Sequence, residues 1–442
     1  MATHPVTEFI SPSAWALVED KFSPFAKETL AKLVDFVQTE VVPAQKAYHE
    51  VIPTDPSKRW TTANPVIKDL KRKARKLGLW NLFGVPLTNL EYAVMAEVMG
   101  RTGTLASEAT NCSAPDTGNM EVLARYGSPE QQKKWLIPLL NGEIRSAFAM
   151  TEYGTASSDA TNVSTSIRVE GDEIVINGHK WWISGAGDVR CAFHIVVGKS
   201  DPTNPNKHLQ QSAILVPANT PGVKVIRNMH VFGYDDAPEG HAEIVYTNVR
   251  VPVSNVIAGW GRGFEILQGR LGPGRIHHCM RAIGIAQGAL DIMIQRVTNP
   301  DRKTFGKALY EHGTIIADIA RSRAELDGAR LLVLSAAHQI DKVKAKGAFK
   351  DIGMAKFIVP TVALGVVDRA MQSHGAEGLS QDTTLAKSWS WMRVLRIADG
   401  PDEVHIQQIG KEELKRAPAL HRRTAETKER EAKIDAQWKT AL

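Results

Sequence analysis

The chain has 442 residues, of which 43% are hydrophobic and 23% charged, so it can bury a large core and has the length of two or three packed domains. Its formal net charge of +6 at pH 7 admits an anionic partner. Nucleic-acid binding gets no support, because the cations are not interleaved with aromatic residues and no zinc-finger or RNP pattern occurs.

Cysteine spacing and the N-terminal sequence indicate the cellular compartment in which the protein is expected. The three cysteines, Cys112, Cys191 and Cys279, form neither a disulfide framework nor a CxxC metal site. No apolar run approaches the roughly 18 residues of a spanning helix, and the N-terminus lacks the features of a signal peptide. We therefore expect no metal and no membrane span, and a location in the cytoplasm or in an organelle matrix, mitochondrial or peroxisomal in a eukaryote.

Residues 1–145 are expected to form a helical N-terminal domain. Ser23-Pro24 begins a helix over Phe25–Val41, and Ser128-Pro129-Glu130 begins another. The basic run at residues 68–76 has apolar residues at helical spacing, so its charges fall on the solvated face of an amphipathic helix.

Residues 146–258 change to a hydrophobic period of two, which predicts a small β domain or barrel. The candidate strands are Ser166–Val169, Glu173–Ile176, Lys180–Ile183, Phe193–Val197, Ser212–Val216, Val223–Arg227 and Ala242–Tyr246. Asn177-Gly178 lies between the second and third and predicts a tight type I′ hairpin, which would place Trp182 and Ser184 at a fixed position.

The start of this β domain combines hydroxyl-bearing, small and aromatic residues. Gly154 lets a ligand approach the backbone, and Trp182 supplies an aromatic wall that suits a flat heterocycle. The hydroxyls that can donate to a phosphate or carbonyl edge are Thr151, Thr155, Ser157, Ser158 and Thr161. From spacing alone, an ordinary Ser/Thr-rich loop explains the same residues.

Residues 259–417 return to a helical period after the glycine-rich segment Gly259–Gly263. Ile315–Ile340 carries a heptad seam, which requires helix partners. The other long helices are expected at Arg275–Arg296, Lys350–Ser373, where Pro360 can cause a kink, and Leu385–Arg396. These predict a four-helix bundle. Residues 418–442 form a charged C-terminal tail, expected to be a solvated helix or frayed.

Three loops of the bundle are candidates for binding or chemistry. Arg302–Lys307 (RKTFGK) suits a pyrophosphate or adenine, although a plain basic loop has the same composition. Gln372–Gly378 is a glycine-rich helix end, which alone indicates a tight turn. In the third loop, Asp402 and Glu403 suit the first turn of a helix, whereas Asp399 precedes the Gly-Pro break and can point into a cleft.

Ser146–Gly187, with its TEY, small residues, SSD and NGHKWWI, resembles the flavin-binding middle domain of the acyl-CoA dehydrogenase family. Tyr153 replaces the usual proline, and YGTASSD is one residue longer than the common form. The resemblance covers roughly residues 20–415. RLGPGRIHHCMRAIGIAQ and RVLRIADGPDEVH look closest to the branch that in animals is fused to a phosphotransferase-like domain. The resemblance implies an α+β multidomain fold with a helical N-terminal domain, a middle β domain and a C-terminal four-helix bundle.

The resemblance also implies that FAD is the cofactor and that the protein is a homodimer or homotetramer. The residues that it places at the FAD of their own subunit are Phe148, Met150, Thr151, Ser157, Ser158, Trp182, Ser184, Gly400 and Glu403. Those that it places at the FAD of a neighbouring subunit are Arg302, Thr304, Phe305, Gln372 and Gly375.

Asp399 aligns with the glutamate of the family's EGT segment, the base that removes the α-proton of the substrate. The resemblance implies that flavin N5 accepts the β-hydride, so that an acyl-CoA becomes a trans-2-enoyl-CoA. The Asp399 N–H and a flavin ribityl hydroxyl would hold the thioester oxygen, with Ser158 and Arg275 as substrate contacts. Gly274 stands where other members carry the base. We expect burial to raise the pKa of Asp399 from about 3.9 toward working pH.

Two alternatives stay open. The first is a related flavin oxidase. An aspartate base also serves relatives that oxidise nitroalkanes, and other relatives pass electrons to oxygen rather than to an electron-transfer flavoprotein or similar acceptor. A non-catalytic binding protein on the same scaffold is the second alternative.

Overall fold

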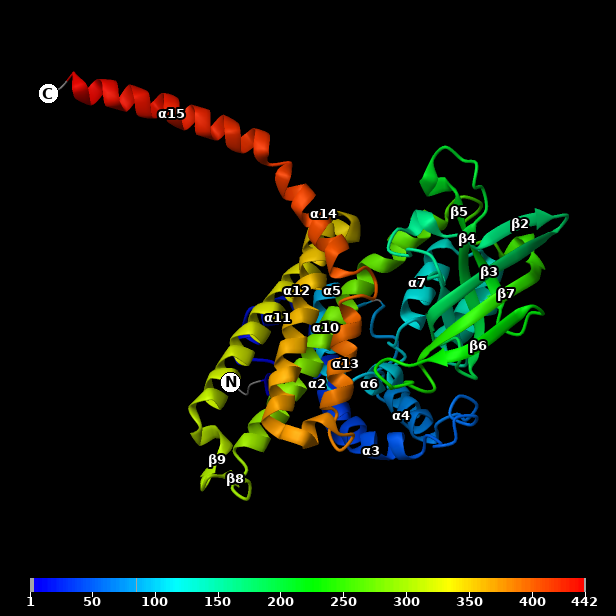
Figure 1. The fold of residues 1–442 in the computed structure, drawn as a ribbon, viewed down its shortest axis with the longest axis horizontal. Coiled ribbons are helices and arrows are strands. Elements are labelled where there is room, and N and C mark those ends of the chain that lie inside the picture. Colours follow the sequence, from blue (N-terminus) through cyan, green and yellow to red (C-terminus); the bar gives the residue numbers. More distant parts are fainter. Residues whose placement is uncertain (1–3, 85, 441–442) are drawn as a thin grey trace.

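The computed structural model describes residues 4–84 and 86–440 and contains a helical N-terminal part, a twisted β-sheet and a bundle of long helices (Figure 1). The sheet lies to one side of the bundle, and N-terminal helices pack between them. This architecture confirms the predicted fold class.

Local capping explains where several N-terminal helices begin. Ser23 Oγ accepts a hydrogen bond from Ala26 N with Pro24 in the first turn, and Thr88 and Glu91 form a capping box. The helices are α1 (Pro12–Ala16), α2 (Pro24–Phe36), α3 (Val42–Glu50), α4 (Pro65–Lys76), α5 (Asn89–Gly100), α6 (Leu105–Ala109), α7 (Asp116–Tyr126), α8 (Pro129–Gln131) and α9 (Ile137–Leu140). Five-residue π-helical segments join α2 to α3 and α8 to α9.

The seven-stranded sheet has the order β1-β4-β2-β3-β7-β6, with β5 paired to β4. β1 runs parallel to β4, whereas β3 pairs antiparallel with both β2 and β7. The strands are β1 (Arg145–Ala149), β2 (Ser166–Glu170), β3 (Glu173–Ser184), β4 (Cys191–Lys199), β5 (Gln211–Pro217), β6 (Val223–Met229) and β7 (His241–Pro252).

The predicted hairpin at Asn177-Gly178 is wrong, because β3 runs through both residues. The register against β7 shifts at this point, and Asn248, with a φ of 49°, donates from its backbone N to Asn177 Oδ1 at 2.7 Å. A Cβ on Gly178 would lie 2.2 Å from Thr165 Oγ1, so the glycine serves a close approach within a bulge. The turn is instead at Gly171-Asp172, between β2 and β3.

The bundle consists of α10 (Gly263–Val297), α11 (Gly313–Gly347), α12 (Phe349–His374) and α13 (Leu385–Leu395), followed by α14 (Asp402–Leu414) and α15 (Ala417–Lys439). The seam of α11 is buried from Ser322 to Ile340, which confirms that this helix has helix partners. α10 begins at Gly263 instead of Arg275, because Ile266 and Leu267 pack against the sheet domain and override the weak helix propensity of glycine. α15 projects from the body (Figure 1).

Two glycines bring α5 and α10 into close contact. A Cβ on Gly284 would lie 2.0 Å from Glu97 O, and one on Gly100 would lie 2.3 Å from Arg281 O. Only glycine allows this approach, which holds the middle of α10 in place. It therefore also positions the side chains that α10 directs toward the cavity described below.

No helix within residues 4–84 and 86–440 is both long and apolar enough to cross a membrane.

Candidate functional site

A cavity of about 990 Å³ lies between the N-terminal helices, the edge of the sheet domain and the helices α10 and α13. Among the site residues predicted from the sequence, Ser184, Arg302 and Asp399 line it. Ser113–Pro115 also line it, so the loop before α7 contributes to its wall. The other predicted residues lie around the cavity or away from it.

Asp399 lies in the turn between α13 and α14, with its backbone in the left-handed region at a φ of 57°. Arg275 Nε donates to Asp399 O at 2.9 Å. Gly400 follows with a φ of 100°, and a Cβ there would lie 2.9 Å from His405 Nε2. The turn is thus held by contacts from α10 and α14, and strain of this kind is typical of functional sites.

The electrostatics of Asp399 differ from the expectation. Burial opposes ionisation, but the hydrogen bond from His278 and the positive charges of Arg270 and Lys356 outweigh it, so the pKa of Asp399 lies well below its ordinary value. His278 Nε2 is 3.2 Å from Asp399 Oδ2. Ile397, two residues before Asp399, is 60% exposed and so does not bury the carboxyl. The predicted rise toward working pH is therefore wrong for this structure.

The loop after β1 is held by a buried ion pair that was not predicted. Lys180 Nζ donates to Glu152 Oε1 at 2.8 Å and to Met150 O at 2.8 Å. Burial lowers the pKa of Lys180 to about 8; burial also opposes ionisation of Glu152, but Lys180 lowers the pKa of this carboxyl to about 2. The lysine of the NGHKWWI pattern was the available signal. This pair fixes the path of the loop that carries Thr151 and the serines that follow.

The predicted loop residues fall into two groups. Ser157 Oγ accepts from Glu152 N at 3.0 Å and donates to Thr155 O at 3.2 Å, so this hydroxyl shapes the loop, whereas Ser158 is exposed. Phe148, in β1, lies 4.1 Å from the guanidinium of Arg270, measured to the ring centroid, which connects the sheet to the cavity wall. Met150 and Thr151 are half-buried.

Trp182 and Ser184 lie at the end of β3, beside His241 of β7. Trp182 is 38% exposed with a φ of 55°, and its ring centroid is 5.7 Å from that of His241. Ser184 Oγ and His241 Nδ1 share a hydrogen bond of 2.8 Å. His241 also lies 6.3 Å from the ring of Trp391 on α13. Sequence reasoning missed His241 and Trp391, which carry no motif.

Arg302, Thr304 and Phe305 belong to a short hairpin, β8 (Lys303–Thr304) and β9 (Lys307–Ala308), at the end of the bundle away from the sheet (Figure 1). Phe305 is 94% exposed. Arg302 forms an ion pair with Glu377, which lies in the turn after α12. Gln372 and Gly375 are exposed near that turn. The structure thus groups these residues with one another at this end of the bundle, and Arg302 also lines the cavity.

The two acidic residues after the Gly-Pro break differ. Asp402 lies in the first turn of α14, as expected, but it is buried and also accepts from Arg396 Nε at 2.7 Å, with which it forms an ion pair. Glu403 is exposed in the first turn of α14.

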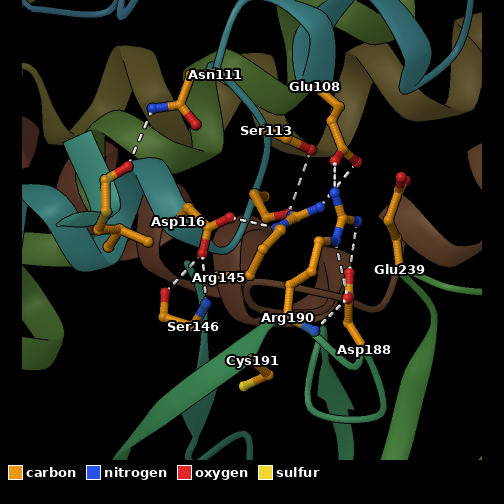
Figure 2. Close-up of polar contacts among 12 residues, drawn as sticks. Glu108, Asn111, Ser113, Asp116, Arg145, Ser146, Asp188, Arg190, Cys191 and Glu239 are labelled. Carbon is orange, nitrogen blue, oxygen red and sulfur yellow. Dashed lines mark hydrogen bonds and ion pairs between the residues drawn. The ribbon is translucent and has the colours of Figure 1, made fainter. Parts of the chain in front are cut away.

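A buried ionic cluster of Glu108, Asp116, Arg145, Asp188 and Arg190 joins the N-terminal helices to the sheet domain. Figure 2 shows the two arginines side by side with Glu108 above both. The oxygens of Glu108 lie 2.8 Å from Arg145 Nη1 and 2.7 Å from Arg190 Nη1. We call this set the Glu108 cluster; it fixes β1 and β4 against α6 and α7.

Three family models match the chain: the acyl-CoA dehydrogenase N-terminal domain over residues 24–143, the middle domain over 147–249 and the C-terminal domain over 261–414.

The relatives agree with these matches. The chain is 50% identical over 392 residues to the probable acyl-CoA dehydrogenase FadE2 of Mycobacterium tuberculosis, covering 87% of this chain and 94% of that protein. It is 50% identical over 454 residues to the probable acyl-CoA dehydrogenase IBR3 of Arabidopsis thaliana, covering 94% and 54%. It is 52% identical over 404 residues to acyl-CoA dehydrogenase family member 10 of Mus musculus, covering 89% and 37%. The chain thus spans about half or less of the last two.

A solved structure from Mycobacterium abscessus, assigned to the acyl-CoA dehydrogenases, has a TM-score of 0.86 and 46% identity, covering 89% of this chain and 99% of that chain. Butyryl-CoA dehydrogenase from Megasphaera elsdenii shares the fold at a TM-score of 0.74 and 24% identity, covering 89% and 99%. With all three domain models matched in order, the chain belongs to the acyl-CoA dehydrogenase family of flavoprotein oxidoreductases.

Proposed function

We propose that this protein is an FAD-dependent acyl-CoA dehydrogenase that converts an acyl-CoA thioester to a trans-2-enoyl-CoA, with Asp399 as the base. The observation that carries the proposal is the geometry of Asp399: its carboxylate lines the cavity, on a strained turn, and is kept ionised by its neighbours. An ionised carboxylate in a partly closed cavity can accept a proton from bound substrate.

Asp399 supplies two functions of the chain itself. Its carboxylate accepts the α-proton of the thioester, and its backbone N–H, which has no backbone acceptor among the described residues, is free to donate to the thioester oxygen. Such a donor stabilises the negative charge that develops when the α-proton leaves. The hydrogen bond from Arg275 Nε to Asp399 O keeps the turn in place.

The residues around Trp182 fit a flavin. The indole is partly exposed beside the Ser184–His241 pair, which offers a flat aromatic wall next to polar groups. The residues that would hold FAD are Phe148, Met150, Thr151, Ser157, Ser158, Trp182 and Ser184. Gly400 and Glu403, which follow Asp399 in the sequence, would also contact it. Bound FAD supplies the hydride acceptor at its N5 atom.

The first test is the cofactor and the reaction. We expect the purified protein to be yellow and an acyl-CoA to bleach the flavin absorbance under anaerobic stopped-flow conditions. An electron-transfer flavoprotein or an artificial acceptor should then restore it, whereas rapid restoration by air would indicate an oxidase. Protein that stays colourless after reconstitution with FAD would contradict the proposal and favour a binding protein on the same scaffold.

We also propose that the active protein is a homodimer or homotetramer, in which Arg302, Thr304 and Phe305, with Gln372 and Gly375, complete the FAD site of a neighbour. The position of the β8–β9 hairpin supports this, because it lies at the end of its own bundle away from the sheet that carries Trp182 (Figure 1). The exposure of Phe305 is a further support, since aromatic residues are enriched at protein–protein interfaces.

Arg302→Ala should weaken FAD binding by about 1.5–3 kcal/mol, the value of a charge-assisted hydrogen bond. FAD should therefore be lost on dilution, measured as flavin that passes an ultrafiltration membrane. Lys303→Ala is the matched control, because it removes a neighbouring cation of the same exposed hairpin. A monomer that keeps FAD tightly would contradict the intersubunit site.

The lowered pKa of Asp399 predicts a flat acidic side of the pH profile. Because a group with a depressed pKa stays ionised as pH falls, the rate of flavin reduction at saturating substrate should show no loss from protonation of Asp399 between about pH 7 and about pH 5. Stopped-flow reduction across this range measures it. A decline whose midpoint shifts in Asp399→Glu would show that the carboxyl titrates there after all.

A further inference from the structure

His278 lies between Asp399 and Arg281 on the cavity wall. Its Nε2 atom is 3.2 Å from Asp399 Oδ2, and its Nδ1 atom is 3.1 Å from Arg281 Nη2. His278 and Arg281 are three residues apart on α10, so they share one face of that helix. Polar contacts thus join the three side chains in a continuous row along the cavity.

The row determines which nitrogen of His278 carries the proton. A guanidinium has donors and no acceptor, so His278 Nδ1 must be the unprotonated, accepting atom. The single proton of the neutral ring is then on Nε2, from which it donates to Asp399. The backbone of Arg281 is fixed by the close crossing of α5 and α10 at Gly100 and Gly284.

The surroundings keep this ring neutral. Burial lowers the pKa of His278, with Arg281 and Lys356 acting in the same direction, and together they outweigh the opposing effect of Asp399. A second proton on the ring would also turn Nδ1 into a donor that faces the donors of Arg281. The charged and titratable groups that face the His278–Asp399 pair are Arg270, Arg275, His277, Arg281, Lys356 and His405.

We propose that His278, held in its Nε2–H form by Arg281, is the positioning residue that orients the Asp399 carboxylate toward the substrate's α-carbon. The proposal rests on the proposed role of Asp399 as base. It assigns to His278 and Arg281 a function that no motif of the sequence indicated.

The proton balance of the step is simple. The α C–H bond breaks, its electron pair stays on the thioester as an enolate, and the proton forms an O–H bond on Asp399. His278 keeps its own proton throughout and takes none. Its N–H fixes one carboxylate oxygen, which leaves the other oxygen of Asp399 directed at the substrate. Orientation of this kind matters for the rate, since a misplacement of about 1 Å can cost on the order of 10²-fold.

The test follows removal of the α-proton alone. Phenylacetyl-CoA has acidic α-protons and no β-hydrogen, so its exchange in D₂O, followed by mass spectrometry, reports the base without hydride transfer. His278→Leu removes the donor and should lower the exchange rate by about 10- to 100-fold. It should also raise the pKa of Asp399, because the ionised form loses a hydrogen bond, so any acidic limb of the rate profile should lie at higher pH than in the parent protein.

Two matched variants show whether the directed hydrogen bond is responsible. His278→Gln keeps an N–H donor and an acceptor at the end of the side chain, and it should restore most of the rate and the original limb. His194→Leu removes another buried histidine, which contacts Tyr246 in the sheet domain at 2.8 Å and does not line the cavity, and it should leave both unchanged. If His278→Gln and His278→Leu behave alike, the orienting hydrogen bond is refuted.

The outcomes separate this inference from the proposed function. Exchange that persists in Asp399→Asn overturns the role of Asp399 as base. Exchange that is lost in Asp399→Asn but normal in His278→Leu overturns only the inference. A second measurement is independent of turnover: ¹⁵N NMR of the His278 ring should show a protonated Nε2 and an unprotonated Nδ1, and in Arg281→Leu this preference should be lost. The opposite form in the parent protein would refute the assignment.

Discussion

Asp399→Asn is expected to leave the flavin bound and to slow its reduction by an acyl-CoA by about 10²–10⁴-fold. Asparagine keeps the size of the side chain and can still accept a hydrogen bond from His278, but it cannot take the α-proton. We expect the upper end of this range, because Gly274 offers no second carboxylate, and a Cβ at that position would have no atom within 4 Å. Stopped-flow reduction, with flavin content measured in parallel, tests both parts of the expectation.

Two further substitutions bracket this result. Asp399→Glu should retain part of the rate, because it restores a carboxylate in a turn shaped for a shorter side chain. Asp402→Asn is the control: it removes a buried carboxylate three residues away, whose partner is Arg396, and should cost about 1–3 kcal/mol of stability while leaving reduction nearly intact. Normal reduction in Asp399→Asn together with none in Asp402→Asn would show that the base is misassigned.

The parts of the fold that were predictable are those in which local pattern and tertiary packing agree. The α11 seam between Ile315 and Ile340 has the same period in the sequence and in the buried face of the helix. The Asn177-Gly178 dipeptide failed because its local preference for a hairpin competes with long-range pairing. β3 gains more by continuing along β7 and absorbing the glycine in a bulge against Thr165.

The candidate site shows the same division. Asp399 was recognisable because a carboxylate before a Gly-Pro break stands out in the sequence. Its pKa was not predictable, since that value depends on His278, Arg270 and Lys356, which come from other helices and meet only in the fold. His241 was missed for the same reason: only the pairing of β3 with β7 brings it to Ser184.

Glu108→Gln is expected to lower the free energy of unfolding by about 3–5 kcal/mol, the cost of leaving buried charges without their partner. The carboxylate of Glu108 is buried and lies within 3.0 Å of cations from three segments, namely Lys71, Arg145 and Arg190. A neutral amide cannot balance them, and its N–H₂ group would face donors. Urea denaturation followed by circular dichroism measures the loss.

The neighbouring Glu239 provides the matched control, because the two carboxyl groups respond to the same surroundings in opposite directions. Burial raises the pKa of Glu239 well above its ordinary value and the charge of Glu108 adds to this, whereas Arg145, Lys71 and Arg190 outweigh the burial of Glu108 and lower its pKa. Glu239 therefore holds the proton of the pair, and Tyr48 donates to it at 3.0 Å.

Since a protonated carboxyl and an amide are both neutral, Glu239→Gln should leave the unfolding free energy near neutral pH unchanged or higher. The stabilisation by Glu108 is present above its unfolded pKa of about 4.5 and is lost as pH falls through its lower folded value, so the difference between Glu108→Gln and the parent should shrink on acidification. A large loss in Glu239→Gln with none in Glu108→Gln would show that Glu239, and not Glu108, carries the negative charge of this pair. Glu239 would then be the residue that attaches the N-terminal helices to the sheet.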